Sequence, residues 1–194
     1  MQRRRALQVL GSLAALPTLG ALSPSELLAL GTRAHETLGD AAGAPRSLSP
    51  AQYRVVTVAA EHIIPRTDTP GATDARVADF VEVILTDWYT ASEREAFLDG
   101  VNTLDARAKR LHGRVFADCP PARRLPLLTE LDNRVGELRV ADPHAAESHW
   151  FAALKTLTVW GYYTSRVGIV EELRDDIMPG RYDGDAPYEA TRAR

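Results

Sequence analysis

Apolar residues recur along most of the chain with the three- to four-residue spacing that is typical of amphipathic helices. The clearest stripe lies between residues 77 and 88, where the apolar positions are Val77, Phe80, Val81, Ile84, Leu85 and Trp88. We expect this stripe to be buried, with Phe80 and Trp88 in the core. No segment alternates apolar and polar residues over a useful length. The pattern therefore predicts an all-α fold, a compact bundle of about six or seven helices.

Capping residues mark where these helices begin. Ser23-Pro24-Ser25-Glu26 and Ser49-Pro50-Ala51-Gln52 are capping boxes with proline at the first helical position. Later helices are predicted to begin at Ser92, after Pro120-Pro121 and at Asp142-Pro143. The chain is therefore divided into helices by local signals alone.

The same pattern predicts which helix positions are buried and how the chain ends. Leu111 and Leu125 are expected on buried helix faces, and residues 161–165 are expected to bend before a short helix that ends near Leu173. Residues 178–194 are polar and contain two prolines and two glycines. They predict an irregular C-terminal tail, because turn formers of this kind build no core.

A nine-residue interruption, residues 65–73, separates two of the predicted helices. Pro65 removes a backbone donor and disfavours helical geometry at Ile64, so the preceding helix should end there. The centre of the interruption combines short polar side chains, which can bond their own backbone, with residues that restrict its angles: Thr67, Asp68, Thr69, Pro70 and Gly71. The sequence therefore predicts a rigid turn.

Composition limits the classes of function. The 194 residues are 45% apolar and 25% charged, which fits one globular domain. The formal net charge of -3 leaves no basic footprint for nucleic acid. Cys119 is the only cysteine, so an internal disulfide and a cysteine-rich metal site are excluded.

The N-terminus reads as an export signal. Arg3, Arg4 and Arg5 precede a weakly apolar stretch, and residues 2–8 resemble the twin-arginine pattern. A general secretory signal and a basic cytosolic helix are the alternatives. We expect residues 1–22 to be the signal, 23–48 an N-terminal helix with a flexible joint, and 49–194 a helical domain with its tail. Removing the signal would leave 20 cations against 26 anions, a net charge of -6.

Motifs for catalysis and cofactors are absent. The chain has no glycine-rich dinucleotide fingerprint, no C-x-x-C-H haem motif and no nucleophile elbow. Its histidines form no pair at i, i+4 with a glutamate beside it, the usual helical zinc arrangement. We therefore expect no flavin, haem or metal in this chain and no catalytic residue, although a Ser–His–Asp site assembled from distant positions stays open.

Two segments resemble one known family. Residues 60–85 contain Ile-Ile-Pro, a Thr-Asp-Thr-Pro-Gly-Ala turn and a helix that begins near Val77. In residues 151–185 an apolar helix runs into Gly-Tyr-Tyr-Thr-Ser, followed by Gly168 and by Pro-Gly-Arg-Tyr-Asp-Gly. Each segment resembles a block of the gluconate 2-dehydrogenase subunit 3 family. With the export signal, the resemblance covers nearly the whole chain in order.

The resemblance implies a small, non-catalytic subunit of periplasmic or membrane-associated sugar and sugar-acid dehydrogenases. Its large partner would be an FAD-dependent flavoprotein of the glucose-methanol-choline type, and a c-type cytochrome with haem would accept the electrons. The small subunit would help the partner mature and carry it through the twin-arginine route to the periplasm. Membrane association would arise only through the complex. Many members have cysteine where this chain has Asp185, so a disulfide at that position is not available.

The resemblance also suggests which residues contact the partner. The turn at residues 67–71 is either a docking surface for the large subunit or a shaped connector that only orients the next helix. Tyr162, Tyr163 and Tyr182 are expected at the interface rather than purely in the core, because tyrosine has an apolar body and a polar tip.

The tail offers further candidates for this interface. Tyrosine and arginine often dominate protein interfaces. We therefore expect the tail to lie as an arm against the large subunit, through Pro179, Gly180, Arg181, Tyr182 and Tyr188. The alternative is that the tail folds back on the helices of its own domain.

Three functions compete on this information. The first is an accessory and escort subunit, the second an enzyme with its own site, and the third a free-standing periplasmic binding or structural protein. The first agrees best with the missing cofactor motifs.

Overall fold

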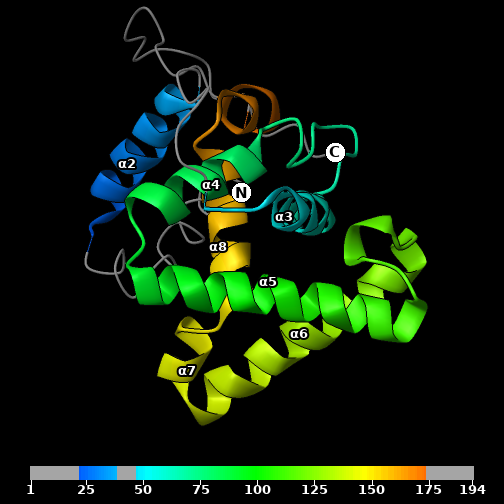
Figure 1. Cartoon of the computed structure of the whole chain (residues 1–194). Helices are drawn as coiled ribbons and strands as arrows, with labels where there is room; N and C mark the ends of the chain where they lie inside the picture. The colour runs from blue at the N-terminus through cyan, green and yellow to red at the C-terminus, as the bar shows by residue number, and fades with distance from the viewer. Residues whose placement is uncertain (1–21, 39–46, 174–194) are drawn as a thin grey trace, which may run out of the picture.

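The computed structural model describes residues 22–38 and 47–173 (Figure 1). In these ranges it contains seven α-helices and no strand, which confirms the all-α prediction and the expected number of helices. The α-helices are α2 (Pro24–Thr37), α3 (Pro50–Ile63), α4 (Val77–Asp87), α5 (Ala91–His112), α6 (Pro121–Ala141), α7 (Pro143–Glu147) and α8 (Trp150–Tyr163). A short 3₁₀-helix, η2 (Phe116–Asp118), precedes α6, and a π-helix, η3 (Val167–Glu172), follows α8.

Capping boxes begin three of these helices. Ser23 and Ser49 cap α2 and α3 as predicted, each with proline at the start of its helix. Helix α5 starts earlier than the expected Ser92, because Thr90 is its N-cap. The Thr90 hydroxyl accepts from the Glu93 amide at 3.3 Å, and the Glu93 carboxylate accepts from the Thr90 amide at 2.9 Å. Such reciprocal caps satisfy donors that a helix start leaves unpaired.

Helix α8 is the central element and contacts every other α-helix of the described residues. Figure 1 shows it behind α5, with α2 and α3 on opposite sides. Leu154, Leu157 and Trp160 are fully buried. The Trp160 indole donates to the Leu27 carbonyl at 3.0 Å and so ties α2 to α8. The N-terminal helix is therefore packed on the core.

The end of α8 differs from the prediction. The sequence predicts a bend at residues 161–165, but the helix continues through Gly161 to Tyr163, and the chain bends only at Thr164 and Ser165. A Cβ at position 161 would lie 2.6 Å from the Phe80 ring. The glycine is needed because α4 and α8 approach each other closely here, and the chain does not turn at this residue.

Helix α4 follows its predicted register for five of the six stripe positions. Phe80 is fully buried, which confirms it as a core residue. The expectation for Trp88 is wrong, since 43% of its surface is exposed. Helix α4 ends at Asp87, and Trp88, as the C-cap with φ -122°, leaves the buried face. Leu111 and Leu125 are also exposed rather than buried, by 54% and 57%, in terminal turns of α5 and α6.

Candidate functional site

Residues 64–76 connect α3 to α4 and form the turn that the sequence singled out. Helix α3 ends at Ile63, and Ile64 has left helical geometry directly before Pro65, as predicted. The Ala72 amide donates to the Ile64 carbonyl at 2.9 Å and closes the base of the turn. The Thr67 amide donates to the Thr69 carbonyl at 3.0 Å and closes its tip. Backbone hydrogen bonds therefore define the loop at each end.

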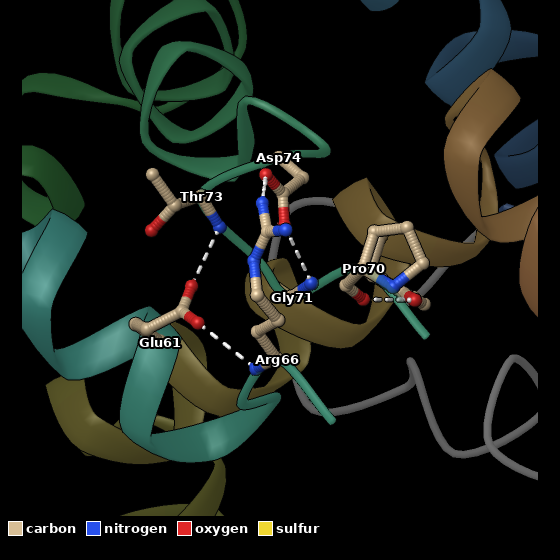
Figure 2. A network of polar contacts seen from close by, with 7 residues as sticks. Glu61, Arg66, Pro70, Gly71, Thr73 and Asp74 are labelled. Carbon is tan, nitrogen blue, oxygen red and sulfur yellow. Dashed lines mark hydrogen bonds and ion pairs between the residues drawn. The ribbon is translucent and has the colours of Figure 1, made fainter. Parts of the chain in front are cut away.

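Two carboxylates brace the turn from inside, as Figure 2 shows. The Glu61 carboxylate accepts from the Arg66 amide and the Thr73 amide, each at 2.9 Å. It therefore joins the segment that enters the loop to the segment that leaves it. The Asp74 carboxylate accepts from the Gly71 amide at 2.9 Å and pairs with the Arg66 guanidinium. Hydrogen bonds to carboxylates are stronger than those between neutral groups. The shape of the turn is therefore held by Asp74 of the turn and by Glu61 from the end of α3.

Gly71 is required by packing. A Cβ at this position would lie 2.6 Å from the Arg66 backbone nitrogen and closer still to the Glu61 carboxylate. Any larger residue would push the brace apart. The glycine that the sequence suggested for its backbone angles thus also makes room for Glu61.

Tyr162 supports the turn from the core. Only 1% of its surface is exposed, and its hydroxyl donates to the Pro70 carbonyl at 2.7 Å. Burial, together with the Glu172 carboxylate, raises the pKa of Tyr162 to about 12, so the hydroxyl keeps its proton at neutral pH. This contact joins the two segments that carry the family resemblance. The structure therefore places Tyr162 in the core, against our preference for an interface position.

Tyr163 occupies a different position. Its ring packs edge-on against Tyr162 at 5.2 Å, and its side chain is only partly buried. Burial, with the Glu172 carboxylate adding to it, raises the pKa of Tyr163 as well. Part of this side chain remains accessible to a partner.

The π-helix η3 follows this tyrosine pair in the chain, after a short bend. The Ser165 hydroxyl donates to the Tyr162 carbonyl at 2.6 Å and accepts from the Gly168 amide at 3.0 Å. This side chain satisfies backbone groups where the chain leaves α8. The Gly-Tyr-Tyr-Thr-Ser block is therefore a structural junction as well as a sequence motif.

The turn presents its tip to solvent and buries its base. Thr67 and Asp68 are exposed, Thr69 and Pro70 are half-buried, and Gly71 is buried. The Thr67 hydroxyl donates to the Asp68 carboxylate at 3.0 Å. Of the five candidate residues in the turn, the first two are thus free to meet a partner, and the last shapes the loop.

Arg76 is a residue that sequence reasoning missed. It is the N-cap of α4 and has φ 54° and ψ 37°, left-handed angles that are uncommon outside glycine. Its guanidinium donates to the Asp79 carboxylate at 2.8 Å, which also accepts from the Tyr53 hydroxyl at 2.8 Å. No local signal marks this conformation, because arginine is not a typical cap.

The described residues contain no group of three histidine, cysteine, aspartate or glutamate side chains placed to hold a metal ion. Within the same ranges, no helix has both the length and the apolar character that crossing a membrane requires. Cys119 is a buried free thiol.

Several predicted residues lie outside the described part of the chain. These are the export residues Arg3 and Arg4, most of the joint at 39–47, and the tail residues Pro179, Gly180, Arg181, Tyr182 and Tyr188. Their proposed roles stay predictions.

Comparison with known proteins agrees with the geometry. The family model described as gluconate 2-dehydrogenase subunit 3 matches residues 50–180, more than half of the 194 residues. The match includes the turn, Tyr162 and Tyr163. No curated protein and no solved structure matches the chain. The chain therefore belongs to the gluconate 2-dehydrogenase subunit 3 family.

Proposed function

We propose that this chain is a non-catalytic accessory subunit of a dehydrogenase complex and that it binds the catalytic subunit through the turn. The observation that carries the proposal is the family match over residues 50–180, together with the contact between its two sequence blocks at Tyr162 and Pro70. In this proposal the oxidation chemistry belongs to the partner.

The turn is suited to docking because it is already ordered. A loop that is rigid before binding loses little conformational entropy when a partner covers it, so more of the contact energy becomes affinity. Here Glu61, Asp74 and Tyr162 hold the backbone, while Thr67 and Asp68 project outward. The tip therefore offers a fixed pattern of polar groups.

The catalytic partner in this proposal is an FAD-dependent dehydrogenase of the glucose-methanol-choline type that oxidises a sugar or sugar acid. A c-type cytochrome would be a further partner. The accessory subunit would assist maturation of the flavoprotein and carry it to the periplasm by twin-arginine export. The tail, from Pro179 to Tyr188, would add a second contact with the flavoprotein.

The docking role can be tested by reversing a charge at the tip of the turn. Asp68→Lys should reduce co-purification of the co-expressed flavoprotein by about tenfold, a loss that corresponds to about 1.4 kcal/mol. Asp99→Lys makes the same charge change on the exposed side of α5 and is the matched control. Flavin absorbance per mole of accessory subunit measures the complex.

The same experiment separates docking from a purely structural turn. If Asp68→Lys and Asp99→Lys retain equal amounts of flavoprotein, the turn is a connector and not a docking surface. If the wild-type chain retains no flavoprotein, the accessory function itself is wrong.

The export role needs a separate measurement. Replacing Arg3 and Arg4 with lysine should leave the subunit and the flavoprotein in the cytoplasm. Cell fractionation followed by immunodetection of each protein would show this. Normal periplasmic amounts of each protein in the variant would contradict twin-arginine export.

A further inference from the structure

A second binding feature lies at the other end of α8. A pocket of about 190 Å³ opens between the start of α5, α7 and the first turn of α8. It is separated from the turn by the length of the helix, since Trp150 and Tyr162 are twelve residues or about 18 Å apart along α8. Nothing in the docking role described above uses this pocket.

The walls of the pocket are aromatic and firmly held. The Trp150 ring packs directly on Gly100 of α5, where no Cβ could fit, and meets the Phe97 ring edge-on at 6.3 Å. Phe97 is buried, whereas Trp150 is half-buried and lines the opening. The indole is thus held in place by its contacts with Gly100, Phe97 and His149.

The charged groups at the pocket have one sign. Glu93 and Glu147 line it, and none of the lining residues is lysine or arginine. The Glu147 carboxylate lies 3.8 Å from the exposed His144 ring. His149, which stacks against Trp150, has its pKa lowered by burial and then by Arg134, so it adds no positive charge at neutral pH. The pocket is therefore complementary to a cation.

Tyr89, a further lining residue, carries a hydroxyl that lies behind the pocket surface. The Tyr89 hydroxyl is buried and has no hydrogen-bond partner among the described residues. Burial, with the Glu93 carboxylate adding to it, raises the pKa of Tyr89, so the hydroxyl stays protonated. Buried hydroxyls nearly always have a partner in folded proteins. The Tyr89 hydroxyl is an exception to this rule, and because it has almost no accessible surface it is not offered to a guest in the pocket.

We propose that this pocket receives an arginine side chain from the dehydrogenase partner. A planar guanidinium stacks on an indole face, bonds carboxylates and is more weakly hydrated than an ammonium group. The size also fits: a cavity of about 150 Å³ holds benzene, and the arginine side chain beyond Cβ likewise has six heavy atoms. That the arginine belongs to the dehydrogenase partner rests on the proposed function. That the pocket binds a guanidinium group does not.

The pocket itself is tested on the full-length chain without a partner. The probe is N-acetylarginine methylamide, and the readout is the NMR signal of the Trp150 indole N–H. We expect a saturable shift with a dissociation constant on the order of millimolar. N-acetylcitrulline methylamide has nearly the same shape without the charge, and it should bind at least tenfold more weakly. Equal binding of the two probes, or no shift at Trp150, would overturn the proposal.

Variants locate the binding and keep the fold intact. Ala96 is exposed on α5 and lines the pocket, so Ala96→Leu should fill it and abolish the shift. Ala106→Leu, at an exposed position of the same helix outside the pocket, should bind as the wild type does. Glu93→Gln removes a charge while glutamine still completes the capping box, and it should weaken binding several-fold. Unchanged binding in Ala96→Leu would place the probe elsewhere and refute the site.

Co-purification of the flavoprotein then tests whether the partner's arginine occupies the pocket. Ala96→Leu should retain several-fold less flavoprotein than Ala106→Leu. Equal retention would show that the partner's arginine does not occupy the pocket. A wild-type chain that retains no flavoprotein would instead contradict the proposed function, while the probe titration would still decide whether the pocket binds a guanidinium.

Discussion

At one end of α8, the Tyr162 hydroxyl donates to the Pro70 carbonyl at 2.7 Å and completes the bracing of the turn. At the other end, the Tyr89 hydroxyl is buried beside the pocket without a partner among the described residues. The same chemical group is thus used internally in one region and left unsatisfied in the other. The two ends of α8 therefore differ: a satisfied buried hydroxyl braces the turn, whereas the end beside Trp150 contains a buried hydroxyl that no described residue satisfies.

The largest expected effect concerns the packing behind the turn. Phe80 stacks on His35 at 5.1 Å and meets Trp160 edge-on at 5.0 Å. Phe80→Ala should lower the free energy of unfolding by about 3–5 kcal/mol, measured by urea denaturation. Trp88→Ala, at the exposed end of the same helix, should have a much smaller effect. Equal losses in the two variants would contradict the burial difference.

The next test acts on the brace itself. Gly71→Ala forces a Cβ against the Glu61 carboxylate and the Arg66 amide, and should destabilise the fold by about 1–3 kcal/mol. Gly136→Ala is the control, because a Cβ on this α6 residue meets nothing within 4 Å. The control should be neutral or slightly stabilising, since alanine favours helices. An unchanged free energy of unfolding in Gly71→Ala would show that the turn can move to accommodate the added Cβ.

A smaller loss is expected when only the Tyr162 hydroxyl is removed. Tyr162→Phe keeps the ring but leaves the Pro70 carbonyl without this donor. The unfolding free energy should fall by about 1 kcal/mol, the typical net contribution of one hydrogen bond. Hydrogen exchange at the Ala72 amide, which closes the base of the turn, should become faster. If stability and exchange stay at wild-type values, the hydroxyl does not brace the turn.

The matching change at the other end of α8 should have the opposite sign. Tyr89→Phe removes a buried hydroxyl that has no partner in the described residues, so stability should stay unchanged or rise by about 1 kcal/mol. Urea denaturation beside Tyr162→Phe gives the comparison directly. A loss as large as that of Tyr162→Phe would mean that the two ends of α8 do not differ in this way.

Local signals explain what could be predicted correctly. The apolar stripe of α4 correctly predicted that Phe80 is buried, because helical spacing alone brings such residues to one face. Pro65 ended α3 through the backbone restriction that it imposes on Ile64. Ser23 and Ser49 began their helices through contacts that reach only three residues ahead.

The errors share a cause, since burial at the end of an element depends on its neighbours. Trp88 continues the apolar stripe in sequence, yet the helix stops one residue earlier and the side chain turns outward. Tyr162 looked like an interface residue because tyrosine suits interfaces, but α8 carries it into the core behind Pro70.

The sequence by itself determined the helical class, most helix boundaries, the rigid turn and the membership of the family, because each depends on short-range patterns. Only the tertiary structure decided the rest. The Glu61 brace, the left-handed Arg76 and the contact between Tyr162 and Pro70 involve positions that local propensity does not link. The pocket brings together Phe97 and Trp150 from two helices, beside the point where Gly100 lets α5 and α8 meet closely. Such long-range contacts follow from how the helices pack, and no spacing within one helix records them.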